Sequence, residues 1–328
     1  MSELPVPDLA PVNRGPLDRS MMIGLIVLGL LAIMPLLSPI LGGDYMLSLV
    51  IKAMIFAIAA ISLDLVLGYG GMVSFGHAVF LGIGAYVTGI ALQEGVYGAF
   101  PILALVLLIS GAFALITGAI SLRTTGVYFI MITLAFAQMV YFSLTSLSYY
   151  GGDDGLTLWD TPEVFGMYLF QTGSGLFYST LVLLALIWFF VWRLAMSRFG
   201  RVLRAAKQNP TRVGSLGYNV FVYRLIAYVI SGMLAGVAGF LLACQAEFIS
   251  PSTTSWQISG HLIIMVVLGG LATRNGPLLG ALFVVLIEEI LSQITHDWRL
   301  IFGPLLVLIV LFSKGGLAGL LKNKRATG

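Results

Sequence analysis

Long runs of apolar residues dominate this chain and leave few folds open to it. Ten such runs follow one another, at 21–41, 46–67, 77–93, 100–121, 126–146, 175–193, 223–246, 258–271, 277–294 and 300–313. A helix of roughly 20 apolar residues crosses the hydrocarbon layer of a membrane and satisfies its own backbone hydrogen bonds there. The runs therefore predict an all-α, polytopic bundle of about ten transmembrane helices.

The scarcity of charge excludes the alternative of a water-soluble protein. Charged residues make up 9% of the sequence, against about 25% in soluble domains. The single cysteine, Cys244, lies in an apolar run and can form neither an intramolecular disulfide nor a cysteine-based metal site. A net charge of +3 gives no reason to expect a nucleic-acid partner.

The positions of the charges predict the orientation of the helices. With the N-terminus in the cytoplasm, fifteen of the seventeen basic residues fall on the cytoplasmic side, and only Lys52 and Arg299 do not. The cytoplasmic residues are Arg14, Arg19, Arg123, Arg193, Arg198, Arg201, Arg204, Lys207, Arg212, Arg224, Arg274, Lys314, Lys322, Lys324 and Arg325. The external loops hold acidic residues instead, at Asp44, Glu94, Asp153, Asp154, Asp160, Glu163, Glu247 and Asp297. Both termini are therefore predicted to be cytoplasmic.

This orientation divides the chain into one membrane domain with two tails. A cytoplasmic tail covers residues 1–20, the transmembrane domain covers 21–313, and a second cytoplasmic tail covers 314–328. Two connections are long, namely an external loop at 147–174 and a basic cytoplasmic loop at 194–222. Neither loop is large enough to bury a core of its own, so no soluble domain is expected.

Two glycine-rich interruptions stand between apolar runs, one at 68–77 and the other at 269–277. Non-helical backbone at membrane depth is tolerated only where protein buries it or where it lines an aqueous cavity, and interrupted helices in a transporter mark the solute path. Glycine also permits close helix packing, which is the alternative interpretation. The residues predicted to line a path are Gly68, Gly70, Gly71, Ser74, Gly76, His77, Gly269 and Gly270.

Charges inside the predicted helices are a further feature. Asp64 lies near the cytoplasmic end of the second run, and Glu288 and Glu289 lie deep in the ninth. Because a charge at the bilayer centre costs roughly 3 kcal/mol, Asp64 and Glu288 are expected to pin helices together or to line a polar path. The isolated His77 and His261 are interpreted as interior hydrogen-bonding residues. No set of ligands at metal-binding spacing is present, and no cofactor is expected.

The basic loop contains a short amphipathic helix at 200–210, which Pro210 is expected to stop. Such a helix can lie against anionic lipid headgroups or bind a cytoplasmic partner. The sequence has no phosphate-binding G-x-x-x-x-G-K-[ST] motif, no H-E-x-x-H and no G-x-S-x-G. The chain is therefore not expected to be an enzyme, and ATP hydrolysis would belong to another subunit.

Several stretches together resemble the LivM-type permease subunit of branched-chain amino acid ABC transporters, over most of residues 45–320. They are Gly68-Tyr69-Gly70-Gly71-Met72-Val73-Ser74-Phe75-Gly76-His77-Ala78, Arg204-Ala205-Ala206-Lys207-Gln208-Asn209 with Gly214, Leu216-Gly217-Tyr218-Asn219-Val220, Arg224 through Gly239, Val267-Leu268-Gly269-Gly270-Leu271 and Gly276-Pro277-Leu278-Leu279-Gly280-Ala281. The resemblance implies a multi-pass protein of the bacterial inner membrane. It also implies a LivH-type second permease, two cytoplasmic ATP-binding subunits and a periplasmic solute-binding protein as partners.

The resemblance further implies an ATPase-coupling role for the basic loop and alternating access as the mechanism. The implied coupling residues are Arg204, Ala205, Ala206, Lys207, Gln208, Asn209, Gly214 and Gly217. Arg204 stands where the family pattern has an acidic residue, and Gln208-Asn209-Pro210 also lacks acidic residues.

The sequence also permits functions other than a permease for branched-chain amino acids. The resemblance is not specific for the solute, and it also implies urea, other amides or aromatic acids as alternatives to branched-chain amino acids. A secondary transporter would instead use Asp64, Glu288 and Glu289 as ion sites. A membrane enzyme is disfavoured because no nucleophile–base pair is found.

Overall fold

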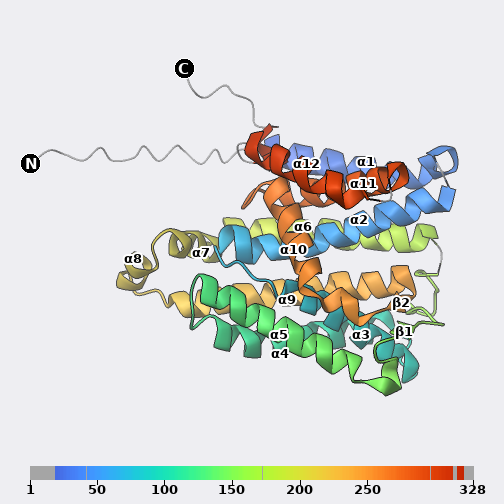
Figure 1. The fold of residues 1–328 in the computed structure, drawn as a ribbon, viewed down its shortest axis with the longest axis horizontal. Coiled ribbons are helices and arrows are strands. Elements are labelled where there is room, and N and C mark those ends of the chain that lie inside the picture. The colour runs from blue at the N-terminus through green and yellow to red at the C-terminus, as the bar shows by residue number, and fades with distance from the viewer. Residues whose placement is uncertain (1–18, 42, 172, 296, 313–315, 321–328) are drawn as a thin grey trace, which may run out of the picture.

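The computed structural model describes residues 19–41, 43–171, 173–295, 297–312 and 316–320. Every apolar run of the sequence forms a helix, and the only sheet within these ranges is a pair of two-residue strands (Figure 1). The prediction of an all-α bundle is confirmed. The predicted tails lie largely outside the described residues, as do Arg14, Lys314, Lys322, Lys324, Arg325 and the side chains of Arg19 and Arg299.

Within the described residues, six helices are long and apolar enough to cross a membrane. They are α2 (Gly43–Asp64, continued by the π-helical turn η1, Leu65–Tyr69), α4 (Ala99–Ser121), α5 (Val127–Thr145), α6 (Gly173–Met196), α9 (Val220–Ala246) and α11 (Gly276–Ile294). Four more are apolar over a shorter length, in α1 (Arg19–Leu41), α3 (His77–Gln93), α10 (Trp256–Gly269) and α12 (Trp298–Phe312). The remaining helical elements are η2 (Ser148–Tyr150), α7 (Arg198–Gln208), α8 (Pro210–Ser215), η3 (Pro251–Thr254) and α13 (Gly316–Leu320).

The α2 helix forms the centre of the bundle. From Ala53 to Asp64 its side chains are almost fully enclosed, and α1, α6, α9, α10 and α11 all pack against it. A helix that is apolar on every side is stable only where other helices or lipid surround it. Its C-terminal end is therefore positioned by the whole bundle.

Small residues allow the other central helices to approach closely. A Cβ atom on Gly84 of α3 would collide with the carbonyl of Gly236 in α9, and one on Gly239 would collide with the carbonyl of Leu81. Between apolar helices in a membrane, close contact of this kind supplies the attraction that the hydrophobic effect supplies in water. The pair α3 and α9 therefore forms a rigid unit beside α2.

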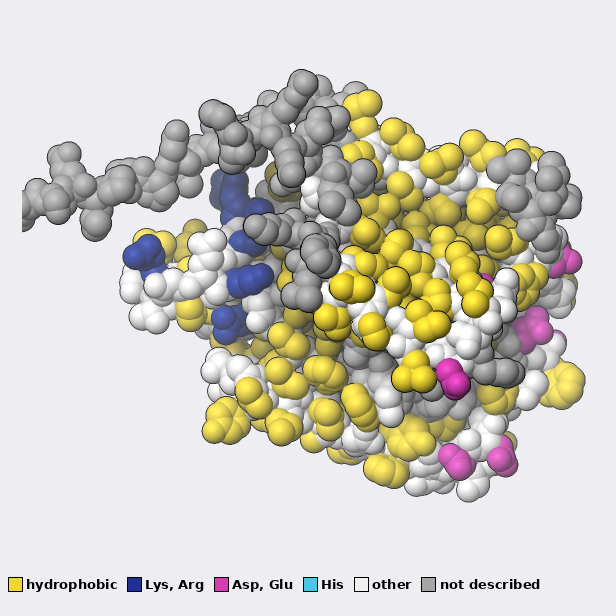
Figure 2. Space-filling view, turned by 45° about the horizontal axis from the view of Figure 1, so that its top comes forward, with side chains coloured by type: hydrophobic (Ala, Val, Ile, Leu, Met, Phe, Trp, Pro, Cys, Tyr) yellow, Lys and Arg dark blue, Asp and Glu magenta, His cyan; other side chains and the backbone are white. Residues whose placement is uncertain are grey.

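The two ends of the bundle carry opposite charge. The end formed by α7 and α8, here called the basic end, carries the lysines and arginines visible in Figure 2, whereas the acidic side chains lie at the opposite, acidic end. At the acidic end, β1 (Leu156–Thr157) pairs antiparallel with β2 (Phe248–Ile249) and ties the predicted external loop to the end of α9. The separation matches the sequence pattern, and the assignment of the basic end to the cytoplasm stays a prediction.

Candidate functional site

The helix α2 ends in an irregular turn at the basic end. The turn Leu65–Tyr69 is π-helical, and beyond it the amide of Gly70 donates to the carbonyl of Leu65 at 3.2 Å and that of Met72 to Val66 at 3.0 Å. Residues 70–76, here called the linking segment, form no helix or strand, and α3 begins at His77. The predicted interruption at 68–77 is therefore present in the backbone.

The linking segment turns back into the bundle. At its far end the ring of His77 (Nε2) shares a hydrogen bond of 2.9 Å with the Ser62 hydroxyl of α2. Ser62 precedes Tyr69 by seven residues, which corresponds to roughly 10 Å along a helix. The segment thus lies alongside the last turns of α2, inside the zone that the helices span. His77 is fully buried and hydrogen-bonded, as predicted.

Burial alternates along the linking segment. Met72, Ser74 and Gly76 are buried, whereas Gly71 is exposed and Val73 and Phe75 are partly exposed. Among the described residues, the N–H groups of Val73 and Ser74 and the carbonyls from Met72 to Phe75 have no hydrogen-bond partner. Backbone groups without partners are rare inside proteins and costlier still at membrane depth. Water or a solute is needed to satisfy them.

The buried face of the segment serves a different purpose. The amide of Phe75 donates to the Thr133 hydroxyl of α5 at 3.3 Å, and the amide of Ala78 donates to the Ser259 hydroxyl of α10 at 3.0 Å. A Cβ atom on Gly76 would lie 2.6 Å from the carbonyl of Thr133. Among the predicted path residues, Ser74, Gly76 and His77 thus hold the segment in place, and Gly71 lies on its open side.

The second interruption, at 269–277, has a different geometry. A Cβ atom on Gly269 would collide with the carbonyl of Gly276, and one on Gly280 would collide with the carbonyl of Met265. Gly270 has φ +116° and ends α10. These glycines let α10 and α11 touch through their backbones, so the geometry here favours the packing interpretation over a path.

Asp64 joins the two interruptions. Its carboxylate accepts a hydrogen bond of 2.9 Å from the backbone N–H of Ala272, in the turn between α10 and α11 (residues 270–275). A Cβ atom on Gly68 would lie 2.6 Å from that same amide nitrogen and would collide with the carboxylate. Gly68 is therefore required for the contact, and Asp64 pins two elements together, one of the two roles expected of it.

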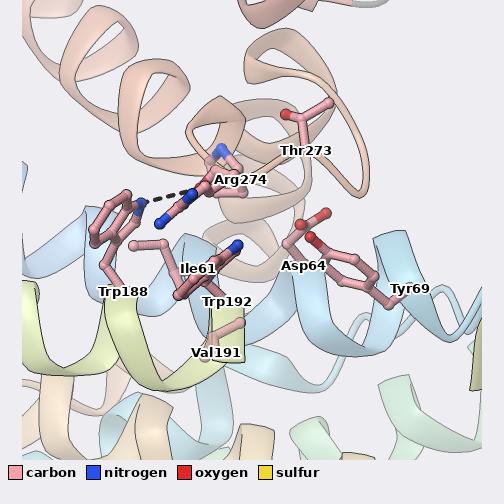
Figure 3. A pocket seen from close by; sticks show the side chains of 9 residues that line it. Ile61, Asp64, Tyr69, Trp188, Val191, Trp192, Thr273 and Arg274 are labelled. Atoms are coloured by element: carbon pink, nitrogen blue, oxygen red, sulfur yellow. Dashed lines mark hydrogen bonds between the residues drawn. The ribbon is translucent and has the colours of Figure 1, made fainter. Parts of the chain in front are cut away.

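A small pocket lies beside Asp64 (Figure 3). The guanidinium of Arg274 is 3.8 Å from the centre of the Trp192 ring and 4.8 Å from that of the Trp188 ring, and Trp188 Nε1 donates to the Arg274 carbonyl at 3.1 Å. Stacking on tryptophan faces stabilises a cation in an apolar setting. The pocket is lined by Ile61, Asp64, Tyr69, Trp188, Val191, Trp192, Thr273, Arg274 and Pro277. The sequence predicted no role for Trp188 and Trp192, which lie within the apolar run 175–193.

The predicted coupling residues divide into an inner and an outer group. Lys207 Nζ donates to the carbonyl of Gly68 at 2.8 Å, the Arg204 guanidinium lies 5.9 Å from the Tyr69 ring, and Ala206 is buried. The outer group is exposed at the basic end and comprises Ala205, Gln208, Asn209, Gly214 and Gly217. Pro210 ends α7 as predicted and also begins α8, which Asn209 caps by accepting from the Arg212 amide at 2.9 Å.

The most protruding apolar side chains of this region were not predicted. Leu216 and Tyr218, in the turn after α8, are 71% and 45% exposed. The turn that holds them follows α8, which lies at the basic end (Figure 1). Exposed apolar side chains close together on a surface are candidates for contact with another protein.

The intramembrane acids near α11 are paired. His261 Nε2 lies 2.7 Å from Glu288 Oε1, so His261 is not isolated, and Tyr45 donates to the neighbouring Glu289. Tyr45 is near the start of α2, which places Glu289 near the acidic end rather than deep in the bundle. Within the described ranges, no three histidine, cysteine or acidic residues are grouped as a metal site.

The chain is similar in sequence to known membrane permeases. The family described as branched-chain amino acid transport system / permease component matches residues 45–311. The chain is 28% identical to the high-affinity branched-chain amino acid transport permease LivM of Salmonella typhimurium, over 80% of this chain and 68% of that protein.

Two further relatives match about half of the chain. A probable branched-chain amino acid permease LivH of Methanocaldococcus jannaschii is 32% identical over 44% of this chain and 47% of its own length. The autoinducer 2 import permease LsrC of Escherichia coli is 30% identical over 48% of this chain and 45% of its own. No solved structure matches the chain.

Proposed function

This chain belongs to the permease family of branched-chain amino acid transport systems, and we propose that it forms, with a homologous second permease, the path of an ABC importer for branched-chain amino acids. The importer would lie in the bacterial inner membrane and draw its energy from separate ATPase subunits. The observation that carries the proposal is the linking segment, in which the N–H groups of Val73 and Ser74 and the carbonyls from Met72 to Phe75 lack hydrogen-bond partners among the described residues, with Val73 and Phe75 partly exposed.

The chemistry of the linking segment suits a zwitterion with an apolar side chain. A backbone N–H group such as that of the partly exposed Val73 can bind a carboxylate, and backbone carbonyls can bind an ammonium group. The side chains of Val73 and Phe75 lie on the same partly exposed face and offer apolar contact. In transporters, interrupted helices present backbone groups in this way to solutes and ions.

The basic end is the proposed contact surface for the ATPases. The rigid pair α7 and α8 projects there, with Leu216 and Tyr218 exposed at its tip. A short helix held firmly to the bundle transmits a displacement that a loose loop would absorb. The acidic end, with its β1–β2 pair, would then face the solute-binding protein.

The name of one relative widens the choice of solute. LsrC is an autoinducer 2 import permease, so membership of the wider group does not by itself fix an amino acid as cargo. Branched-chain amino acids are favoured by the apolar Val73 and Phe75 and by the relative that matches 80% of the chain. An ion-coupled transporter has less support, because Asp64 and Glu288 are both held by protein groups.

The test uses the assembled transporter in liposomes, with the second permease, the ATPases and the solute-binding protein. Leucine uptake is expected only with ATP, with valine and isoleucine competing and urea and phenylalanine not. Uptake driven by an ion gradient in the absence of ATPases would refute the proposal.

A cysteine at position 73 tests the path itself. Val73→Cys should react with a hydrophilic thiol reagent, and leucine-loaded binding protein should slow the reaction. Leu108→Cys, at an exposed apolar position of α4, should stay unreactive because lipid surrounds it. The native Cys244 is buried, so background labelling will be low. Equal reactivity at positions 73 and 108 would contradict a path along the linking segment.

A further inference from the structure

We propose that Lys207 is the positioning residue that links α7 to the solute path, because it caps the C-terminal end of the central helix α2. The inference rests on the proposed function. It assigns one residue to the transmission of movement from the ATPases to the solute path. Sequence reasoning placed Lys207 among eight coupling residues without separating its role from theirs. The geometry gives it a contact that none of the other seven makes.

The contact satisfies a need of the helix end. The last carbonyls of any helix lack partners within it, and a cation placed there also interacts favourably with the helix dipole. At the end of α2 the carbonyls of Leu65, Val66 and Leu67 accept from amides of residues 70–72. The carbonyl of Gly68 accepts instead from Lys207 Nζ at 2.8 Å. The cap on α2 thus comes from a helix more than a hundred residues away.

The stem of Lys207 covers the start of the linking segment. A Cβ atom on Gly71 would lie 2.7 Å from Cγ of Lys207, so the methylene groups rest directly on that glycine. Gly71 has φ +70°, a conformation in which glycine is favoured over other residues. One side chain of α7 therefore contacts both the last turn of α2 and the first bend of the linking segment.

The helix α7 is itself fixed to the bundle, so that it moves as a unit. Ala206 is buried, and its carbonyl accepts from the guanidinium of Arg224 in α9 at 3.2 Å. The Arg204 guanidinium donates to the carbonyl of Ala195 at 3.0 Å and lies near Tyr69 in η1. Movement of α7 would then reach η1 through the side chains of Arg204 and Lys207, of which Lys207 donates to a backbone carbonyl of that turn and Arg204 lies near a ring.

The far side of the same turn is tied to α10 and α11. Asp64 accepts from the amide of Ala272, and Gly68 leaves the room for that approach. If Lys207 moved Gly68, the adjacent hydrogen bond between Asp64 and the Ala272 amide would move with it. The linkage therefore runs from α7 through the end of α2 to the turn 270–275. The unpaired backbone groups of residues 72–75 follow that end of α2 directly in the chain.

A purely structural cap would have different consequences. It would lower the stability of the folded chain and leave ATP hydrolysis and transport reduced in proportion. A positioning role predicts that ATP hydrolysis continues while the conformation of the path no longer changes with it. The experiment must therefore measure the accessibility of the path and the rate of ATP hydrolysis separately.

The test measures labelling of Val73→Cys in the full complex, with and without a non-hydrolysable ATP analogue. In the otherwise unchanged chain the analogue is expected to alter the labelling rate. With Lys207→Met added, that response should be lost, leucine uptake per ATP hydrolysed should fall about tenfold, and hydrolysis should stay within about twofold. Lys207→Arg, which keeps a cationic donor, should restore the response.

Arg201→Met serves as the matched control, because Arg201 is a cation of the same helix whose side chain, within the described ranges, makes no hydrogen bond to the end of α2. It should leave the response intact. An unchanged analogue response in Lys207→Met would overturn the proposal, and so would a proportional loss of hydrolysis and uptake. If Val73→Cys is unreactive under every condition, the path assignment fails rather than the linkage.

Discussion

The two glycine-rich interruptions look alike in sequence and differ in structure. At 68–77 the chain leaves the helix, turns back beside α2 and presents backbone groups that have no partner among the described residues. At 269–277 the glycines bring α10 and α11 into backbone contact, and the turn between them accommodates Asp64. The comparison teaches that glycine in a membrane protein either opens the backbone or closes a helix interface.

The difference follows from what surrounds each glycine. A Cβ atom on Gly71 would meet the methylene stem of Lys207, whereas one on Gly269 or Gly280 would meet backbone. A flexible side chain can yield to an added methyl group, and a backbone carbonyl held in a helix cannot. A substitution at Gly71 should therefore fail through transport, and one at Gly269 or Gly280 through folding.

The largest effect is expected from Gly280→Ala. Its methyl group would collide with the carbonyl of Met265, so α10 and α11 must separate, which should lower the free energy of unfolding by about 3 kcal/mol. Thermal unfolding of the purified chain in detergent measures this. Gly29→Ala, in α1 where nothing lies within 4 Å of the added atom, is the matched control and should be neutral. Equal stability of the two variants would remove the packing interpretation.

Asp64→Ala tests the contact that joins the two regions and should have the next largest effect. Loss of the carboxylate leaves the partly buried Ala272 amide without its acceptor, at a cost of about 2 kcal/mol. Asp64→Asn keeps an acceptor oxygen and should recover most of the stability. If both variants unfold at the same temperature, the bond to Ala272 does not hold the regions together.

Gly71→Ala should separate transport from stability. A side chain at φ +70° costs roughly 1–2 kcal/mol, and here it would also displace the stem of Lys207. Gly95→Ala carries the same strain at φ +82° with open space around it, at the end of α3. Both should lose similar stability in thermal unfolding, and only Gly71→Ala should lose leucine uptake. A matching loss of uptake in both variants would contradict a special role for Gly71.

The smallest effect is expected from the contact of His261 in α10 with Glu288 in α11. His261 Nε2 and Glu288 Oε1 lie 2.7 Å apart, an ion pair only when the histidine is protonated, and their coupling should be about 1 kcal/mol, the net value of a hydrogen bond. A double-mutant cycle with His261→Ala and Glu288→Ala measures it. A coupling of several kcal/mol would mean that the ion pair, and not the glycine contact, holds these helices.

The helices could be predicted because apolar length is a property of the sequence. All ten runs form helices within a few residues of the expected ends, and the amphipathic pattern of 200–210 gave α7 with Pro210 at its limit. The π-helical turn at 65–69 could not be predicted, because Leu65, Val66 and Leu67 simply continue an apolar run. Hydrogen-bond register is decided by the packing around the end of α2, which no local pattern records.

The site was predictable as segments and not as contacts. Glycine suits an open path and a tight interface for the same reason, the missing Cβ atom, so the sequence left both interpretations standing at 68–77 and at 269–277. Asp64 was expected to have a polar partner, but that partner is a backbone amide 208 residues away. The contact of Lys207 with Gly68 had no signal either, because a backbone carbonyl is present at every position.

The π-helical turn has a consequence for how the family can vary in length. Such a turn is equivalent to one extra residue inside an α-helix. Removing one residue from 65–69 should therefore restore ordinary α-helical winding and leave the residues downstream in their present orientation. Removing one residue from the regular part of α2 would instead rotate the downstream residues by about 100°. Single deletions assayed for leucine uptake should accordingly be tolerated better at 65–69 than at 53–64, so this turn is a place where the helix can change its length by one residue.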